Sequence, residues 1–496
     1  MISNLPPQAQ VARFILASAF AWTLAPALVH LAPPIDVVES AMWGPEWVIG
    51  TYKHPAMPAW VIEIGRRATG TLGWPVYLAS QLFVAATLWL TYCIGRDLMD
   101  APRGAAAALS LAGVEYVSWA SPNFNHNIAE MPFWVAAIWL AWRAADTGSW
   151  RAWIGLGAVA AAGLYAKFSL AVILLVIAIW LLADARARRT LATAGPWLAL
   201  TTFLIGAFPL ARWLIGNDFG PLGYASARAG DSLASQLAFL PRVALSGLPI
   251  VAVLALAGLL GRIWHPLGPR APAPVPAPVD DRAHRFLLWM ALGPPLLVLA
   301  GAILTRTGLR GSWGAPMLAL PAVLAIAWTS RRFERPALAI VARCAMVLAV
   351  AVPFAYAVIV STLLRPETRP SRVNWPQTAI AAELRSAWAR ETSGAQLLLI
   401  AGDTWIAGLG GIGADQPSIL TDGDMRRSPW ITPERLQRQG ALVVWEQVSR
   451  GKPPGLDALI AGRTVHEARF PWPRARAAPD LVVYYAIIPP AARTAK

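Results

Sequence analysis

Two apolar runs near the start of the chain decide its class. Residues 11–31 read VARFILASAFAWTLAPALVHL, with Arg13 as the only charged residue, and residues 74–95 read WPVYLASQLFVAATLWLTYCIG, with none. About 20 largely apolar residues suffice to cross a bilayer as a helix. The two runs therefore predict membrane-spanning helices, and the tryptophan-rich residues 32–73 become the loop that joins them.

The remainder of the chain has the same character. Of its 496 residues, 56% are hydrophobic and only 14% are charged, and the mean hydropathy is +0.49. Soluble domains carry about 25% charged residues, so this composition excludes a disordered chain, a coiled coil and an ordinary soluble globule. We predict eleven spans, at residues 11–31, 74–95, 103–120, 128–144, 152–166, 168–183, 191–215, 237–262, 285–304, 314–330 and 337–363. The short runs 152–166 and 168–183 also permit one long helix with a re-entrant piece.

Arginine is unevenly distributed between the two sides of this predicted bundle. The clustered cations fall on alternate connections, at Arg96, Arg103, Arg143, Arg151, Arg186, Arg188, Arg189, Arg262, Arg270, Arg282, Arg285, Arg331, Arg332 and Arg335. By the positive-inside rule this side is cytoplasmic, which places the N-terminus inside and, with an odd number of spans, the C-terminus outside. The net charge of +15 is then better explained by topology and lipid phosphates than by nucleic acid.

The composition changes after residue 364, where charged residues, Pro and Gly return. Strand-like runs at 396–401, 441–445 and 481–488 and helix-like stretches at 378–392 and 433–439 predict a small α/β domain. The expected fold is therefore a mostly α polytopic membrane domain, residues 1–364, followed by a soluble domain, residues 365–496, on the non-cytoplasmic side. A Pro/Ala-rich segment at 265–279 is predicted to be a cytoplasmic linker.

The chemically richest external segment is residues 33–67, PPIDVVESAMWGPEWVIGTYKHPAMPAWVIEIGRR. Asp36 and Glu39 follow its two prolines, and on a helix this spacing places both carboxylates on one face. A carboxylate at the membrane boundary suits a general base that takes a proton from a hydroxyl. The alternative is that Asp36 only caps a helix by accepting backbone N–H bonds. Position alone leaves both interpretations open.

Other polar residues are expected on the same membrane face. Lys53 and His54 suit a phosphate, with Lys53 as a compact point charge, although a lipid headgroup contact is the alternative. Three further external turns supply amides, a histidine and cations, at a depth where polar groups either cap helices or face a wet cavity. These turns hold Asn123, Asn125, His126 and Asn127, then Tyr165, Ala166 and Lys167, and then Arg306, Arg310 and Trp313.

Together these residues resemble the GT-C glycosyltransferases. Asp36 and Glu39, followed by GTYKHPAMPAW at residues 50–60, are similar to the first external loop of the family 39/83 group. That group includes protein mannosyltransferases, lipid A aminoarabinose transferases and rhizobial galacturonosyltransferases. Its bacterial branch is also similar in the turn 123–127 with Pro132, Phe133 and Trp134, in the run 163–167, and around Arg310, Trp313 and Pro316. The resemblance covers about residues 10–330.

The resemblance implies an inverting transfer of one sugar from a polyprenyl-phosphate donor to a lipid, polysaccharide or protein, on the periplasmic face of a bacterial inner membrane. Asp36 is the implied base and Glu39 the second acid of the loop. The expected contacts of the donor phosphate are Lys53, His54, Lys167, Arg306 and Arg310. The expected substrate contacts are Tyr52, Trp60, Asn123, Asn125, His126, Asn127 and Trp313. Tyr52 stands where some relatives place a metal-binding acid, so a divalent metal is only an option and no metal ligand is assigned.

Two other classes of protein stay open. A transporter or flippase of lipid-linked saccharides would place acids and bases at mid-span in paired, broken halves, whereas the polar residues found here lie at external span ends. In a non-catalytic assembly subunit, the acids and cations of residues 36–60 would have no function. No nucleotide-binding glycine loop is evident, which favours a lipid-linked donor. Sugar transfer from polyprenyl-phosphate donors discriminates among the three classes.

Overall fold

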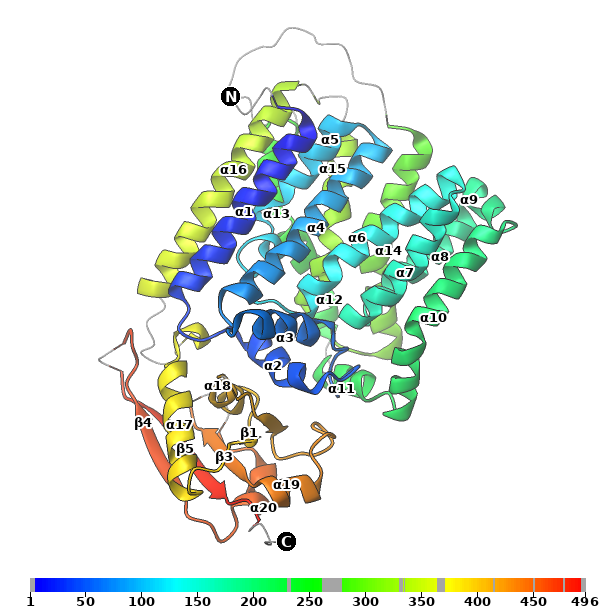
Figure 1. The fold of residues 1–496 in the computed structure, drawn as a ribbon. Helices are drawn as coiled ribbons and strands as arrows, with labels where there is room; N and C mark the ends of the chain where they lie inside the picture. The colour runs from blue at the N-terminus through cyan, green and yellow to red at the C-terminus, as the bar shows by residue number, and fades with distance from the viewer. Residues whose placement is uncertain are drawn as a thin grey trace.

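The structure, a computed structural model, describes residues 5–229, 233–260, 279–329, 333, 335–363, 371–413, 415–448, 451–475 and 478–491. Figure 1 shows a bundle of helices with a small sheet region at one end, and α2 (Ile35–Trp43) and α3 (Met57–Thr69) lie where the two meet. The predicted class, a mostly helical polytopic membrane protein with a small α/β region near its C-terminus, is confirmed. The predicted linker 265–279 lies outside the described residues, apart from Val279.

Six helical segments among the described residues are long and apolar enough to cross a bilayer. They are α1 (Pro7–Val29), α4 (Trp74–Leu98), α10 (Ala194–Gly216), the pair α12 (Leu233–Ser246) and α13 (Leu248–Leu256), α14 (Asp281–Thr305), and Pro336–Leu363 around α16 (Arg335–Val358). The bundle also contains α5 (Ala101–Ser110), α6 (His126–Thr147), α7 (Trp150–Ala166), α8 (Leu170–Ala183), α9 (Ala185–Thr190), α11 (Gly220–Ala229) and α15 (Ala319–Thr329). Every predicted span contains helix. Several of these helices are shorter than a bilayer crossing requires, so the structure does not establish eleven crossings.

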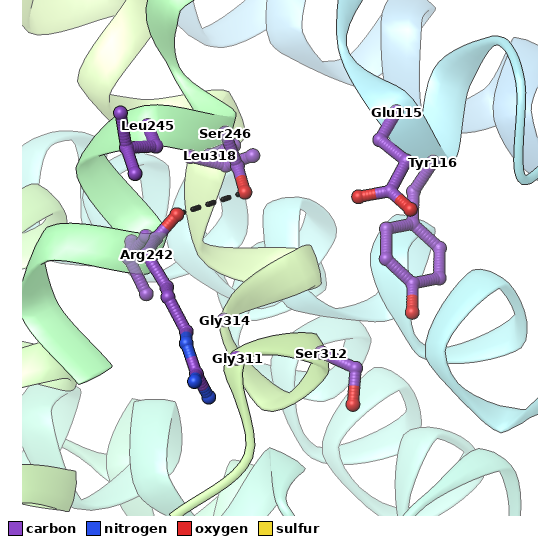
Figure 2. A pocket seen from close by; sticks show the side chains of 10 residues that line it. Glu115, Tyr116, Arg242, Leu245, Ser246, Gly311, Ser312, Gly314 and Leu318 are labelled. Atoms are coloured by element: carbon purple, nitrogen blue, oxygen red, sulfur yellow. Dashed lines mark hydrogen bonds between the residues drawn. The ribbon is translucent and has the colours of Figure 1, made fainter. Parts of the chain in front are cut away.

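The predicted span 103–120 is wrong as a single helix. The helix α5 ends at Ser110, and the chain continues through two 3₁₀ turns, η3 (Leu111–Gly113) and η4 (Glu115–Val117). Gly113 weakens a helix, and it approaches α13 so closely that a Cβ here would lie 2.8 Å from Cβ of Pro249. The helix therefore stops inside the bundle, and η4 lines a small cavity opposite Arg242 and Ser246 (Figure 2).

Two further predicted spans are interrupted near glycine and proline. The run 237–262 divides at Gly247 into α12 and α13, and the run 314–330 begins with a 3₁₀ segment, η5 (Gly311–Leu318). Proline lacks the N–H that a helix interior requires, and Pro316 lies within η5. The two short runs 152–166 and 168–183 form separate helices, α7 and α8, and not one long helix.

A five-stranded sheet forms the C-terminal region. Its strands are β1 (Leu399–Gly402), β2 (Ser418–Thr421), β3 (Ala441–Glu446), β4 (His466–Phe470) and β5 (Leu481–Ile488), in the order β2-β1-β3-β5-β4. β1 is parallel to β2 and β3, and β5 is antiparallel to β3 and β4. The helices α17 (Gln377–Glu391), α18 (Ile406–Gly411), α19 (Pro433–Gln439) and α20 (Asp457–Ile460) accompany it. The three predicted strands are present, whereas β2 and β4 had no clear signal, because β2 is short and β4 is mostly polar.

The first external loop and the C-terminal region share a hydrophobic core. Val38 and Met42 of α2 pack in one cluster with Ile406 of α18. The side-chain amide of Gln416 adds a hydrogen bond to the carbonyl oxygen of Ala41 at 2.7 Å. The helix α2 is therefore held between the bundle and the sheet region, as Figure 1 shows.

Asp403 is a buried acid at the end of β1. It is 1% exposed, and its Oδ1 accepts backbone N–H bonds from Trp405 and Ile406, both at 2.7 Å. Burial raises the pKa of Asp403 to about 6, although the two backbone bonds act in the opposite direction. The ionised carboxylate therefore weakens the folded state at neutral pH.

We expect Asp403→Asn to stabilise the sheet region near neutral pH by up to about 3 kcal/mol, because the amide keeps an oxygen for the backbone bonds and carries no charge. The folded pKa lies above the unfolded one, so the stability contributed by protonated Asp403 is complete below about pH 4 and is lost as the pH rises through about 6. Hydrogen exchange of β1 amides, corrected for intrinsic rates, should show this step in the wild type only. A variant that is less protected at neutral pH would contradict the expectation.

Candidate active site

Asp36 lies in the first turn of α2 and is held by two side-chain amides. Its Oδ2 accepts hydrogen bonds from Nδ2 of Asn123 at 2.9 Å and from Nδ2 of Asn125 at 3.1 Å. No side-chain capping hydrogen bond begins α2, so the structure does not support the alternative of a helix cap. Within the described residues Oδ1 of Asp36 has no such donor, and this oxygen is available to a ligand.

Asn125 takes its orientation from the start of α6. It is the N-cap residue, and its Oδ1 accepts the backbone N–H of Asn127 at 2.9 Å and of Ile128 at 3.2 Å. Because the amide oxygen is engaged in this way, the amide nitrogen is directed toward Asp36. One side chain therefore caps a helix and positions the acid.

Lys53 faces Glu39, one turn further along α2. Its Nζ lies 2.6 Å from Oε2 of Glu39, and the side chains are only 15% and 10% exposed. The hydroxyl of Thr51 accepts the backbone N–H of Lys53 and of His54, which closes the turn that presents them. Burial is the largest single influence and lowers the pKa of Lys53, but the charge and hydrogen bond of Glu39, together with Tyr224 and Asp36, raise it by more in sum, so the net pKa lies above that of a free lysine. The amine is therefore cationic at neutral pH.

A second lysine is held by a buried acid. Lys167 follows α7, and its Nζ donates to Oδ1 of Asn127 at 2.8 Å and lies 3.4 Å from Oε2 of Glu130. The other oxygen of Glu130 accepts the Ser169 hydroxyl at 2.7 Å. Glu130 is fully buried, and a buried carboxylate needs a counter-charge. Sequence reasoning gave Glu130 no role; the signal that points to it is an acid inside an apolar span.

These groups line one cavity of about 620 Å³. Its polar part is formed by Asp36, Glu39, Lys53, His54, Asn125, His126, Asn127 and Lys167, and Arg310 and Trp313 line it from the segment that follows α14. Apolar side chains of α8, α11 and α14, among them Val172, Leu222, Leu297 and Val298, complete the wall. Segments far apart in sequence therefore build an amphipathic cavity, which suits a ligand with a charged head and an apolar tail.

Four residues of the predicted site do not line this cavity. Asn123 reaches it only through the hydrogen bond to Asp36. The ring of Tyr52 lies under the guanidinium of Arg427, 5.3 Å away, and Trp60 donates its indole N–H to a loop carbonyl at 2.9 Å. Arg306 ends α14 in a left-handed conformation and is exposed. Tyr52 and Trp60 therefore support the loop.

The two histidines of the cavity lie against each other. The ring centroids of His54 and His126 are 4.1 Å apart, and Nε2 of His126 lies 3.0 Å from the carbonyl oxygen of Pro55. In the part of the chain that the structure describes, no group of three or more His, Cys, Asp or Glu could hold a metal ion. A divalent metal stays a hypothesis from the sequence.

The fold and this cavity define a class: a polytopic membrane protein with two acids and two lysines lining an amphipathic cavity. A family model for dolichyl-phosphate-mannose-protein mannosyltransferases matches residues 53–213, roughly a third of the chain. The fold is similar to the crystal structure of ArnT from Cupriavidus metallidurans bound to undecaprenyl phosphate, with a TM-score of 0.61 and 14% identity over 96% of this chain and 97% of that one. The structural match shows that the two chains share a fold, and the family model matches only part of this chain.

Two other solved structures are less similar. The arabinofuranosyltransferase AftD from Mycobacteria gives a TM-score of 0.49 at 13% identity, over 97% of this chain and 41% of that one. The oligosaccharyltransferase from Archaeoglobus fulgidus gives 0.41 at 11% identity, over 89% and 69%. No curated protein sequence matches the chain. The fold assignment therefore rests on the ArnT structure.

Proposed function

We propose that this protein is an inverting glycosyltransferase that moves a sugar from a polyprenyl-phosphate donor to a lipid, polysaccharide or protein acceptor. The observation that carries the proposal is the cavity itself, where Asp36, Lys53 and Lys167 share one space with an apolar wall. The matched family is named for a dolichyl-phosphate donor, and the similar ArnT structure holds undecaprenyl phosphate. These names support a lipid-linked phosphate as the shared ligand.

The residues present suffice for a single displacement. The acceptor oxygen forms a bond to the anomeric carbon while the bond from that carbon to the phosphate oxygen breaks, and the electron pair stays on the phosphate. The hydroxyl proton passes to Asp36; because a hydroxyl is a weak acid, this transfer is concerted with the attack. Lys53 and Lys167 face the negative charge that develops on the leaving phosphate, and such stabilisation is usually a large part of catalysis. Attack from the face opposite the phosphate inverts the sugar.

We place this reaction on the periplasmic face of a bacterial inner membrane. The N-terminus is then cytoplasmic, residues 1–364 are the catalytic membrane domain, and residues 365–496 form a periplasmic domain. The arginine distribution along the sequence supports this orientation. We expect a cysteine introduced at Asp480 to be labelled by a membrane-impermeant thiol reagent from the periplasmic side only.

The proposal is tested with the purified full-length chain in lipid nanodiscs and a panel of synthetic polyprenyl-phosphate sugars. We expect release of polyprenyl phosphate with at least one donor, an inverted product by proton NMR, and no release from nucleotide sugars. Movement of an intact donor across proteoliposomes without cleavage would favour the flippase alternative. No cleavage and no movement across the panel would contradict both.

The sheet region positions the catalytic helix in this proposal. A Cβ on Gly408 of α18 would collide with Cγ1 of Val38 and lie 3.0 Å from Sδ of Met42, both on α2. We expect Gly408→Ala to displace Asp36 and to lower kcat by about tenfold, because small misplacements of reacting groups are costly. The measurement is steady-state release of polyprenyl phosphate.

The matched control lies on the same helix. A Cβ on Gly410 would lie 2.8 Å from Cδ1 of Leu384, within the C-terminal region, and meets no residue of α2. We expect Gly410→Ala to affect stability but not kcat, and Val38→Ala to restore kcat when combined with Gly408→Ala. Equal losses in the two glycine variants, with no rescue, would show general destabilisation.

A further inference from the structure

The segment that follows α14 forms part of the wall of the proposed donor site. We call residues 305–313 the wall segment, because six of them line the cavity of about 620 Å³: Thr305, Thr307, Leu309, Arg310, Ser312 and Trp313. The segment leaves α14 through Arg306, whose φ of 54° is left-handed and uncommon for a residue other than glycine. Such a conformation persists only where its surroundings impose it, so the wall segment needs support from other elements.

One buried amide, that of Gln236 in α12, supplies such support. Its Nε2 donates to the carbonyl oxygen of Ala302 at 3.0 Å and to that of Thr307 at 2.9 Å, so it holds the backbone on both sides of Arg306. Gln236 is 7% exposed and lies in Leu233–Leu256, which is long and apolar enough to cross the membrane. A polar side chain there is costly unless it is hydrogen-bonded, and it commonly serves function. Sequence reasoning assigned Gln236 no role, because the predicted span begins at residue 237.

The neighbours of Gln236 on α12 extend this contact. The hydroxyl of Ser235 accepts the backbone N–H of Leu309 at 3.0 Å. Phe239 is buried in one cluster with Ala302 and Leu309, and Trp313 packs against that cluster. Among the described residues, none of α12 lines the larger cavity. The helix α12 therefore affects this cavity through the wall segment that it holds.

Glycines allow the far end of the wall segment to lie close to α12. A Cβ on Gly311 would lie 3.2 Å from Cδ of Arg242, and a Cβ on Gly314 would lie 2.5 Å from Cγ2 of Val243. Figure 2 shows Arg242 of α12 beside Gly311. Arg310 thus lies between two anchor points, the hydrogen bonds of Ser235 and Gln236 before it and the close packing at Gly311 after it. Its place at the cavity follows from α12.

We propose that Gln236 is a positioning residue, which sets where Arg310 and Trp313 meet the donor. It touches no substrate and acts through the backbone of the wall segment. The inference rests on the proposed function and adds to it a residue outside the cavity. Without the amide, two carbonyl oxygens lose their donor and the segment loses its anchor next to Arg306. The guanidinium of Arg310, which suits a phosphate, would then be displaced, whereas Asp36 keeps its own amide contacts.

The test is a double-mutant cycle read by binding, which needs no turnover. The full chain in neutral detergent is titrated with undecaprenyl phosphate. We expect Gln236→Met, which keeps the length of the side chain without its amide, and Arg310→Gln each to weaken binding about tenfold. Because Gln236 acts through the segment that carries Arg310, the double variant should bind at most about threefold more weakly than Arg310→Gln alone. Additive losses, about a hundredfold in the double variant, would overturn the inference.

Gln10→Met is the matched control. Gln10 of α1 is also a buried glutamine, 5% exposed, and its Nε2 donates to the carbonyl oxygen of Leu5 at 2.9 Å. It lines neither described cavity, so binding should be unchanged. Hydrogen exchange of residues 305–313 should be faster in Gln236→Met and unaltered in Gln10→Met. Faster exchange with wild-type affinity would show that the amide orders the segment without positioning a ligand contact, and would overturn the inference.

A second variant covers the case in which Gln236→Met does not fold. Ser235→Ala removes only the hydrogen bond to Leu309 and should weaken binding about threefold, again without additivity to Arg310→Gln. Wild-type affinity in Ser235→Ala, with unchanged exchange of the wall segment, would contradict the role of α12.

Failure of this inference and failure of the proposed function give different results. With an active donor, Gln236→Met should raise the KM for the donor more than it lowers kcat. Donor cleavage by the wild type together with additive losses in the cycle would leave the proposed function intact and remove the role of Gln236. Coupled losses in undecaprenyl phosphate binding, with no donor cleaved by the wild type, would contradict sugar transfer and retain that role. No binding by the wild type would overturn both.

Discussion

Asp36→Asn is expected to slow sugar transfer by about a thousandfold, which is a typical contribution of a positioned general base. Asparagine has the same shape and keeps an oxygen for Asn123 and Asn125, so the loop should keep its structure. The amide cannot take up the hydroxyl proton, so kcat should fall while the KM for the donor stays nearly constant. Steady-state release of polyprenyl phosphate measures both quantities.

Asp480→Asn provides the matched control for that substitution. Asp480 is an exposed carboxylate in the C-terminal region and does not line the cavity, so its loss should leave kcat unchanged. Thermal unfolding of the two variants in nanodiscs should match the wild type. A folded Asp36→Asn protein with the wild-type rate would remove Asp36 from the mechanism.

Lys53→Met is expected to lower kcat/KM by about a hundredfold, because it removes the cation proposed to face the donor phosphate. It also removes the counter-charge of Glu39, and breaking such a buried pair costs about 3 kcal/mol of stability. The variant should therefore lose activity and unfold at a lower temperature. Activity and thermal unfolding are measured on the same preparation.

The double variant Lys53→Met with Glu39→Gln separates these two effects. Neutralising Glu39 removes the charge that Lys53 balanced, so stability should recover, whereas the missing phosphate contact keeps kcat/KM low. Lys452→Met, outside the cavity, is the control for loss of a lysine in general. Recovery of activity together with stability would show that Lys53 has a structural role only.

Much of the fold could be predicted because the signals are local. Apolar runs identified the bundle helices apart from the short α9 and α11, and hydrophobic runs located β1, β3 and β5. The ends of helices were less predictable, because α5 stops where Gly113 contacts α13 and η5 replaces the start of a predicted span. These breaks depend on packing between elements, which the composition of a single run does not contain.

The residue types of the site could be predicted from the sequence, whereas the orientation of several side chains could not. The acids of α2, the lysine turn and the amides before α6 were recognisable as polar groups at span ends, and the structure brings Asp36, Glu39, Lys53 and Lys167 to one cavity. Tyr52, Trp60 and Arg306 carry comparable residue types but lie outside it. A sequence shows which side chains have suitable chemistry, but the direction in which each one points depends on how its loop closes.

The sequence by itself determined the membrane class, the approximate helices and the set of polar residues expected at one membrane face. Hydrophobicity and charge are local properties of the chain, and they determine directly which segments enter the bilayer and in which orientation. Only the tertiary structure decided that Glu130 holds Lys167, that Gly408 packs against α2, and that Glu115 and Arg242 face one small cavity. These relations join residues far apart in sequence, and they arise from close packing between elements, which no local pattern encodes.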